Sequence, residues 1–499
     1  MIIKIAMLVV FFAVIISVGL YCRKKATSVH NFVLGGRSIG PWMSAFSYGT
    51  AYFSAVVFIG YAGQFGWRFG ISAVWIGLGN AIIGGLLAWI VLGRRTMVMT
   101  RHLGSATMPA FFTKRYDCKR MRTAASAIIF IFLIPYTASL YNGLSRLFSM
   151  AFGIDFTICI VVMAALTAIY VIAGGYFASS VNDFIQGIIM LAGIIMVVAA
   201  VLNVNGGFTA SIDALARVQD LEISTTPGAF ASFFGPDPVT LLGVVILTSL
   251  GAWGLPQMVQ RFYAIQSEKA VLKGTVISTL FALVIAGGSY FLGSFGRLFT
   301  DVDYVKANGY DSIVPAMLSG FSDALIGFVI VLVFAASMST LSALVMTSAS
   351  TFTLDFLKPG FKGKMNEKSQ LLTIRIMILF FIVISAAIAM IQYKNSLIFI
   401  AQLMGISWGA LAGAFLAPFL YGLYWKRATK TAVWCCFIFS TVFMTLNILV
   451  RDMFPPLLRS PINAGAFAMI LGLLIVPVVS MFTKAPDKPV VDDAFSCFD

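Results

Sequence analysis

Apolar runs long enough to cross a lipid bilayer follow one another along almost the whole chain. A transmembrane helix needs about 20 consecutive apolar residues to cross the hydrocarbon core. The runs cover approximately residues 3–22, 41–63, 71–93, 121–150, 156–175, 182–202, 239–262, 272–296, 322–350, 371–392, 396–424, 431–450 and 462–482. This pattern predicts an all-α polytopic membrane protein with about 13 transmembrane helices.

The composition excludes the soluble classes of protein. Of the 499 residues, 60% are hydrophobic and only 11% are charged, whereas about a quarter of the residues of a soluble domain are charged. The six cysteines lack metal-type spacing, which argues against a disulfide framework or a zinc site. We therefore predict a single transmembrane domain over residues 1–482. A polar cytoplasmic tail follows over residues 483–499, and we expect it to be disordered.

The distribution of basic residues predicts how the chain lies in the membrane. The net charge is +15, and the predicted loops of one face hold about three times as many Lys and Arg residues as those of the other face. Basic loops stay in the cytoplasm. Because the number of predicted spans is odd, the N-terminus lies outside and the C-terminus inside. We expect this arrangement in the plasma membrane of a cell.

Missing motifs exclude several functions. No G-x-x-x-x-G-K-[ST] motif is present, so the sequence predicts no ATPase. The only histidines, His30 and His102, fall in predicted loops, which excludes a bis-histidine haem within one chain. The sequence predicts no enzyme, no cofactor, no nucleic-acid partner and no particular oligomer. A secondary transporter fits best, and a channel or sensor built on a transporter scaffold is the alternative.

Two apolar segments contain small and polar residues at membrane depth. The second segment includes Ser44 to Ala55, and the seventh includes Thr248 to Gln257 with a Gly-Leu-Pro sequence. Broken helices survive in a membrane where they line a cavity, and interrupted helices at matching positions of two halves indicate a transporter binding site. Close helix packing is the alternative. The spacing of five segments predicts inverted repeats over about 41–202 and 239–424.

The ninth segment carries four hydroxyl side chains within six residues: Ser337, Ser339, Thr340 and Ser342. Hydroxyls and freed main-chain carbonyls together suit a monovalent cation such as sodium. The alternative is that each hydroxyl bonds back to its own helix. Because few acids lie within the predicted spans, sodium coupling is favoured over proton coupling, which stays the nearest rival.

Several motifs in order resemble those of the sodium/solute symporter family, including bacterial sodium/pantothenate and sodium/proline permeases. They are Phe32–Pro41, Ala173–Tyr176, Asn182–Gly187, Met338–Ser342 and Gly422–Ala428, and the resemblance extends over about residues 5–480. It implies the leucine-transporter fold, with predicted helices 2–6 and 7–11 as the inverted repeats. It also implies sodium-coupled uptake of a small organic solute.

The resemblance also implies roles for individual residues. The sodium ligands would be the carbonyl oxygens of Thr50, Phe53 and Ala336 and the hydroxyls of Ser339 and Thr340. Asp183 would lie on the exit route of the ion, or it would simply accept backbone amides at the start of a helix. The candidates for solute binding, which could also be ordinary packing residues, are Tyr52, Tyr136, Trp253, Gln257 and Trp408.

Two positions depart from the pattern of the relatives that carry proline. Those relatives have an acid at the position of Tyr52 and an aromatic residue at the position of Thr248. The departures argue against proline. The Thr50–Ser54 and Gly254–Gln257 motifs resemble those of the pantothenate and monocarboxylate branch more closely, which implies a carboxylate or amino-acid-like solute. With no carboxylate at the predicted ion site, a second sodium ion would be costly to desolvate. We therefore expect one sodium ion per solute.

Overall fold

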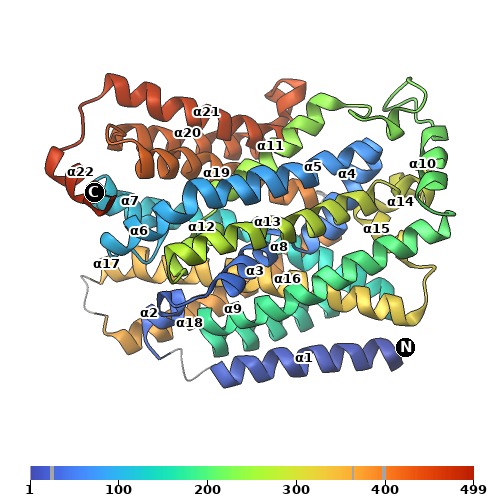
Figure 1. The fold of residues 1–499 in the computed structure, drawn as a ribbon, viewed down its shortest axis with the longest axis horizontal. Coiled ribbons are helices and arrows are strands. Elements are labelled where there is room, and N and C mark those ends of the chain that lie inside the picture. The colour runs from blue at the N-terminus through green and yellow to red at the C-terminus, as the bar shows by residue number, and fades with distance from the viewer. Residues whose placement is uncertain (1, 23–26, 362–364, 396–399, 499) are drawn as a thin grey trace.

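Long helices lying side by side make up the computed structural model of the chain (Figure 1). It describes residues 2–22, 27–361, 365–395 and 400–498, without the side chains of residues 170, 173, 394 and 395. Over this part the chain forms no β-sheet, and its only β-type pairings are the isolated bridges Ile39–Ile265 and Asp220–Ser224. Residues 23–25 of a predicted basic loop and residues 396–399 of a predicted span lie outside the described residues.

Ten stretches of the described chain are long and apolar enough to cross a membrane, and the bent pair α11–α12 makes an eleventh if it is one span. One of these ten stretches, Val56–His102, consists of several shorter elements, from η3 to α6. The other long helices are α1 (Ile2–Cys22), α8 (Lys119–Phe152), α9 (Phe156–Val204), α13 (Glu268–Gly293), α16 (Asp323–Thr351), α18 (Glu367–Asn395), α19 (Ile400–Tyr424), α20 (Lys430–Leu449) and α21 (Pro461–Phe482).

Shorter elements complete the chain. The shorter α-helices are α2 (Val29–Leu34), α3 (Pro41–Tyr52), α4 (Ala62–Phe69), α5 (Val74–Gly79), α6 (Arg94–His102), α7 (Met108–Arg115), α10 (Phe208–Arg217), α11 (Pro238–Gly254), α12 (Pro256–Ala264), α14 (Val302–Asn308), α15 (Ile313–Leu318), α17 (Lys358–Gly360) and α22 (Lys488–Phe495). The π-helical turns are η3 (Val56–Tyr61), η5 (Asn80–Leu87), η6 (Trp89–Gly93) and η10 (Phe352–Leu357). The 3₁₀ turns are η2 (Gly35–Arg37), η4 (Gly70–Ala73), η7 (Ala229–Ala231), η8 (Gly296–Leu298), η9 (Tyr310–Ser312), η11 (Arg451–Met453), η12 (Pro456–Leu458) and η13 (Ser496–Phe498).

The predicted count of thirteen spans is not confirmed, although the described helices follow the predicted runs closely. The difference arises where helices are interrupted. The predicted run 41–63 is divided between α3 and the stretch that starts at Val56. The predicted fifth and sixth runs both lie within α9, from which the ten stretches include only Gly174–Val204. Thirteen therefore stays a prediction.

Both helices that the sequence marks as interrupted are broken in the structure. Helix α3 ends at Tyr52, and the next residue, Phe53, is extended with φ −105° and ψ 103°. Helix α11 ends at Gly254, Leu255 is extended with φ −77° and ψ 122°, and α12 starts at Pro256. The axes of α11 and α12 differ by 45°. Each break therefore consists of a short non-helical segment between two helical ends.

A third break occurs at a single residue of α9, where the sequence predicts a loop. The predicted loop between runs 156–175 and 182–202 is absent, because α9 continues through it. The only interruption is Gly175, with φ 62° and ψ −170°, a conformation that glycine adopts without strain. The second half of α9 therefore begins several residues earlier than predicted.

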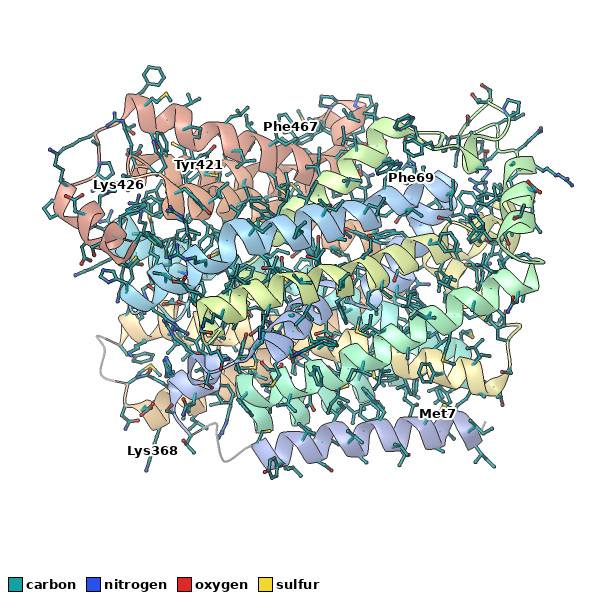
Figure 2. The ribbon with its side chains drawn as sticks, viewed as in Figure 1. Met7, Phe69, Lys368, Tyr421, Lys426 and Phe467 are labelled. Carbon is teal, nitrogen blue, oxygen red and sulfur yellow. The ribbon has the colours of Figure 1, made fainter. Side chains whose placement is uncertain are left out.

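Helices α16 and α19 form the centre of the molecule. The most apolar window of α19 is 94% buried and that of α16 is 83% buried, compared with 28% for α1. Figure 2 shows side chains filling the space between the helices, with Met7 on α1 and Phe467 on α21 near opposite edges of the view. The hydroxyl groups of α16 therefore face other helices rather than lipid.

The C-terminal tail is folded, so the expectation of disorder is wrong. Helix α22 covers residues Lys488–Phe495, and the turn η13 follows it. Its apolar side chains Val491, Ala494 and Phe495 are buried. They recur at the spacing of one helix face, which allows a short polar segment to pack on the rest of the protein.

Candidate functional site

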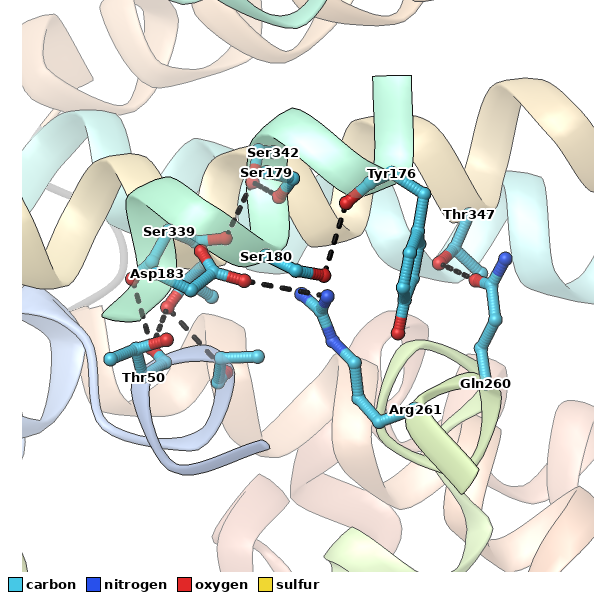
Figure 3. A network of polar contacts seen from close by, with 12 residues as sticks. Thr50, Tyr176, Ser179, Ser180, Asp183, Gln260, Arg261, Ser339, Ser342 and Thr347 are labelled. Carbon is cyan, nitrogen blue, oxygen red and sulfur yellow. Dashed lines mark hydrogen bonds and ion pairs between the residues drawn. The ribbon is translucent and has the colours of Figure 1, made fainter. Parts of the chain in front are cut away.

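Two hydroxyl groups of α16 meet the end of α3 where that helix breaks. The hydroxyl of Ser339 donates to the carbonyl of Thr50 at 3.1 Å, and the hydroxyl of Thr340 donates to the same oxygen at 3.0 Å. Both hydroxyls also lie 3.0 Å from the carbonyl oxygen of Ala336. Figure 3 shows Ser339 directed toward Thr50. Four oxygens from two helices therefore converge in the buried centre of the protein.

These four oxygens belong to four of the five residues predicted as sodium ligands. All of them are neutral, and Thr50, Ser339 and Thr340 are fully buried. The fifth residue, Phe53, is the extended residue of the break, and the role of its carbonyl oxygen stays a prediction. Unwound backbone carbonyls at a helix C-terminus are a usual way to hold sodium in transporters. The described residues contain no group of three or more His, Cys, Asp or Glu side chains suited to another metal.

A further polar layer links α16 to α9. The hydroxyl of Ser342 donates to the carbonyl of Ser339 at 2.9 Å, and it lies 2.9 Å from the hydroxyl of Ser179. These contacts connect the cluster of oxygens to the second half of α9 (Figure 3). Adjacent hydrogen bonds therefore connect the predicted sodium ligands to α9.

A buried ion pair lies next to this layer. Arg261 of α12 and Asp183 of α9 are 3.4 Å apart, and their side chains are 2% and 0% exposed. The guanidinium also lies over the ring of Tyr176 at 5.1 Å, as Figure 3 illustrates. A buried charge needs a partner because desolvation is costly. This pair was not predicted, although a lone arginine at the end of an interrupted apolar run is a signal for it.

The position of Asp183 in α9 excludes one of its two predicted roles, the acid on the ion exit route or the acid at a helix start. Helix α9 is continuous after Gly175, so Asp183 lies about two turns inside a helix. The interpretation as an acid at a helix start that accepts backbone amides is therefore wrong. Its role on an ion route stays a prediction.

Three candidates for solute binding lie together. The ring of Trp408 lies 5.9 Å from the rings of both Tyr52 and Tyr136. The hydroxyl of Tyr52 donates to the carbonyl of Thr248 at 2.5 Å, which connects the two broken helices. All three aromatic residues are buried. They form a common aromatic wall between α3, α8 and α19.

The other two candidates differ in how their polar atoms are used. The indole N–H of Trp253 donates to the carbonyl of Ile83 in η5 at 2.9 Å. In contrast, neither polar atom of the buried Gln257 amide makes a hydrogen bond within the described residues, and the same is true of the indole nitrogen of Trp408. Buried polar groups are nearly always bonded. Gln257 and Trp408 therefore have hydrogen-bonding capacity left for a ligand, and the Trp253 N–H does not.

The space beside the first break is closed. A cavity of about 10 Å³ lies between Phe53, Ser54, Leu332 and Ala336. This volume is about what a single water molecule needs. In this conformation the helices are therefore closely packed beside the predicted sodium ligands Phe53 and Ala336.

Known proteins resemble the chain over nearly its full length. The family model described as "Sodium:solute symporter family" matches residues 32–438. A sodium/proline symporter of Staphylococcus aureus (strain JH9) is 29% identical over 503 residues, covering 98% of this chain and 94% of that protein. The predicted resemblance to this family is confirmed.

Two solved transporters have a similar fold. One is a Na⁺-coupled sialic acid symporter in its substrate-bound outward-open state, with a TM-score of 0.73, 17% identity, and coverage of 97% of this chain and 99% of that one. The other is Mhp1, a nucleobase-cation-symport-1 family transporter in a closed conformation with bromovinylhydantoin bound, with a TM-score of 0.52, 15% identity, and coverage of 92% and 97%. At these identities they show the fold alone, and it is the leucine-transporter fold that the sequence implies.

Family, fold and apolar spans agree on a multi-pass membrane protein. The coupling ion is sodium, and no cofactor is indicated. The chain belongs to the sodium:solute symporter family and is a sodium-coupled secondary transporter of a small solute rather than an enzyme.

Proposed function

We propose that the protein imports a small carboxylate or amino-acid-like solute together with sodium, by alternating access. The observation that carries this proposal is the meeting of the Ser339 and Thr340 hydroxyls with the Thr50 carbonyl at the break after α3. A bound sodium ion would lie between these oxygens, and the two hydroxyl groups would turn their protons away from it. The ligands would be Thr50, Phe53, Ala336, Ser339 and Thr340.

The second break would hold the solute. Helix α12 starts at Pro256, and the positive end of a helix dipole favours a negatively charged group. Gln257 lies in the first turn of that helix, with both polar atoms of its amide unbonded. The Trp408 indole nitrogen likewise makes no hydrogen bond to the part of the chain that the structure describes. We assign recognition of the polar group of the solute to Gln257 and Trp408, and the wall around its apolar part to Tyr52 and Tyr136.

The cytoplasmic gate would consist of contacts that join α12 to its neighbours. Arg261 pairs with Asp183 of α9. The Gln260 amide donates to the carbonyl of Val33 at 3.1 Å and accepts from the hydroxyl of Thr347 at 2.6 Å. These contacts would have to separate before ion and solute leave, which gives Asp183 its place on the exit path.

The proposed orientation has the N-terminus outside and the C-terminus in the cytoplasm. The two termini lie at opposite ends of the long axis of the molecule (Figure 1), and the basic loops favour the C-terminal end as the cytoplasmic one. Each of the proposed inverted repeats, about 41–202 and 239–424, contains one of the two breaks that the sequence marks, and the break at Gly175 lies in the first repeat. A reporter that is active only in the cytoplasm, fused after Lys484, should be active.

Uptake into proteoliposomes tests the function. Labelled carboxylates and amino acids are offered with an inward sodium gradient, with an inward proton gradient, and with neither. The proposal expects accumulation of one solute class with sodium only. Accumulation driven by protons alone would favour the proton-coupled alternative, and continuous ion flux without any solute would favour a channel. Equal uptake under all conditions would overturn the proposal.

A further inference from the structure

The C-terminal helix α22 packs across the end of the molecule where α6 and α7 lie (Figure 1). Helix α22 contacts both α6 and α7, and the turn η13 contacts α6. Figure 2 shows Lys426, just beyond the end of α19, at this same end of the molecule. The tail therefore touches segments that are far apart in the sequence.

Aromatic side chains of the tail cover three basic residues. The ring of Phe495 lies 5.0 Å from the guanidinium carbon of Arg115 and 5.6 Å from the ammonium of Lys426. The ring of Phe498 lies 4.6 Å from the guanidinium carbon of Arg95. Cations at this distance from an aromatic face are attracted to it. Because Phe495 is also buried, it is the main anchor of the tail.

Charged groups supplement this anchor. Asp493 lies 3.4 Å from the Nε2 atom of His102 at the end of α6, and the hydroxyl of Ser496 lies 3.5 Å from the same nitrogen. Asp492 lies 4.0 Å from Lys426, with both side chains largely exposed. Exposed ion pairs contribute little each. These ion pairs therefore help to orient the tail, and they contribute less to its binding free energy than the aromatic contacts do.

The contacted elements belong to different parts of the molecule. Helix α6 packs against α12, which carries the proposed gate residues, whereas α7 packs against α8. Arg115 of α7 donates to the carbonyl of Gly422 at 2.8 Å and to that of Trp425 at 2.9 Å, at the end of α19. The tail thus closes over a junction of α6, α7 and α19. Alternating access moves helix groups against one another around a fixed site.

We propose that α22 and η13 form a latch that favours the closed state of this end of the transporter. The proposal rests on the alternating-access function proposed above. When the ends of α6, α7 and α19 move apart, the tail loses part of its contacts. The latch therefore lowers the population of the state that is open at this end, as any contact made in only one state does.

Labelling of a cysteine in the gated pathway tests the latch. Ser44 is buried in α3, between the start of that helix and the ion site, and Ser44→Cys is introduced into a chain without the six native cysteines. Labelling with a maleimide is measured in lipid nanodiscs, where both faces are accessible and orientation does not matter. The chain truncated after Lys484 should label about tenfold faster or more, because the tail makes several contacts and the loss of each shifts the equilibrium by about two- to fivefold.

Two point variants and a control refine the test. Phe495→Ser should accelerate labelling nearly as much as truncation, and Asp493→Asn less. Asp487→Asn is the matched control, since Asp487 makes no side-chain capping bond at the start of α22, and it should have no effect. Hydrogen–deuterium exchange over residues 256–264, with native cysteines present, should rise on truncation as well.

The outcomes distinguish the latch from the transport function. If truncation changes neither labelling nor exchange, the latch is overturned, whatever sodium does. If truncation accelerates labelling but sodium has no effect on either chain, the latch stands and sodium coupling fails. If sodium slows labelling of both the full-length and the truncated chain, and the truncated chain labels faster in each condition, the latch and sodium coupling are both supported.

Discussion

The two broken helices have similar backbones and very different surroundings. Phe53 and Leu255 are both extended residues at the end of a membrane helix. The first break faces the hydroxyls of Ser339 and Thr340 from α16. At the second, Gly254 packs so closely on α19 that an added Cβ would lie 2.7 Å from the Leu416 nitrogen.

This difference indicates that side chains decide what a break can bind. Each break contains a helix end with carbonyl groups and a helix start with amide groups. At the first break, neighbouring oxygens support the carbonyl end, which suits a cation. At the second, the side-chain amide of Gln257, in the first turn of α12, makes no hydrogen bond within the described residues, which suits an anionic or polar solute.

The largest expected effect tests the first break. Ser339→Ala combined with Thr340→Ala removes two oxygens that the buried site cannot replace, at about 1–3 kcal/mol each. Sodium-driven uptake should be nearly abolished, and each single change should weaken the apparent sodium affinity. Ser337→Ala is the control, because the Ser337 hydroxyl donates to Val333 of its own helix at 2.6 Å. Wild-type sodium dependence in the double variant would show that these hydroxyls only brace the helix.

The second break is tested by Gln257→Leu. The loss of a buried amide that binds the solute should raise the KM for the solute about tenfold or more, while the sodium dependence changes much less. Trp253→Phe serves as comparison, since the N–H that it removes bonds to Ile83. It should lower stability and leave the KM close to wild type. If Gln257→Leu changed the KM for the solute and the sodium dependence of uptake equally, the two breaks would not have separate roles.

The neutrality of the first break predicts the coupling ratio. Its four converging oxygens carry no charge, and the nearby carboxylate of Asp183 already faces Arg261. We expect one sodium ion per solute, with electroneutral transport if the solute is an anion. At zero membrane potential, the accumulation ratio of the solute should equal the sodium gradient in proteoliposomes. Accumulation that follows the square of the sodium gradient would mean two ions per solute.

The smallest effect concerns Asp311, which bonds to the first described residue of the central helix α19. Its carboxylate accepts from the Ile400 backbone N–H at 3.3 Å and lies 3.8 Å from the Nε atom of Arg146. Burial raises the pKa of Asp311 above its ordinary value. The folded state therefore holds this proton more tightly than the unfolded state does, and stability falls as the pH rises through the folded pKa.

Asp311→Asn should remove this component of the pH dependence of thermal unfolding. The change should appear as a flatter profile on the acidic side of neutrality, measured in detergent or nanodiscs. Asp303→Asn, at an exposed position of α14, should leave the profile unchanged. A profile that is the same in both variants would mean that Asp311 does not influence stability through its proton.

Local sequence determines the breaks and the cluster of hydroxyls, so both could be predicted. Small and polar residues together mark the two breaks, whereas Pro135, Pro418 and Pro477 lie alone inside unbroken helices. Ser339 and Thr340 face inward because α16 is central. The pairing of Asp183 with Arg261 joins residues 78 positions apart and depends on how α9 meets α12. The docking of α22 likewise depends on a receiving surface that folding creates. Neither could be read from one segment alone.

The break at Gly175 has a consequence for how the protein is made. Helix α9 contains 49 residues, about 74 Å of helix at 1.5 Å per residue, more than twice the thickness of the hydrocarbon core. No loop separates its two halves, and only polar residues that are themselves helical, among them Ser179, Ser180 and Asp183, follow the break. The change in backbone direction between the two halves therefore depends on a single glycine. A residue with a side chain would be strained at the positive φ of this position, so a substitution here should lower the yield of folded protein.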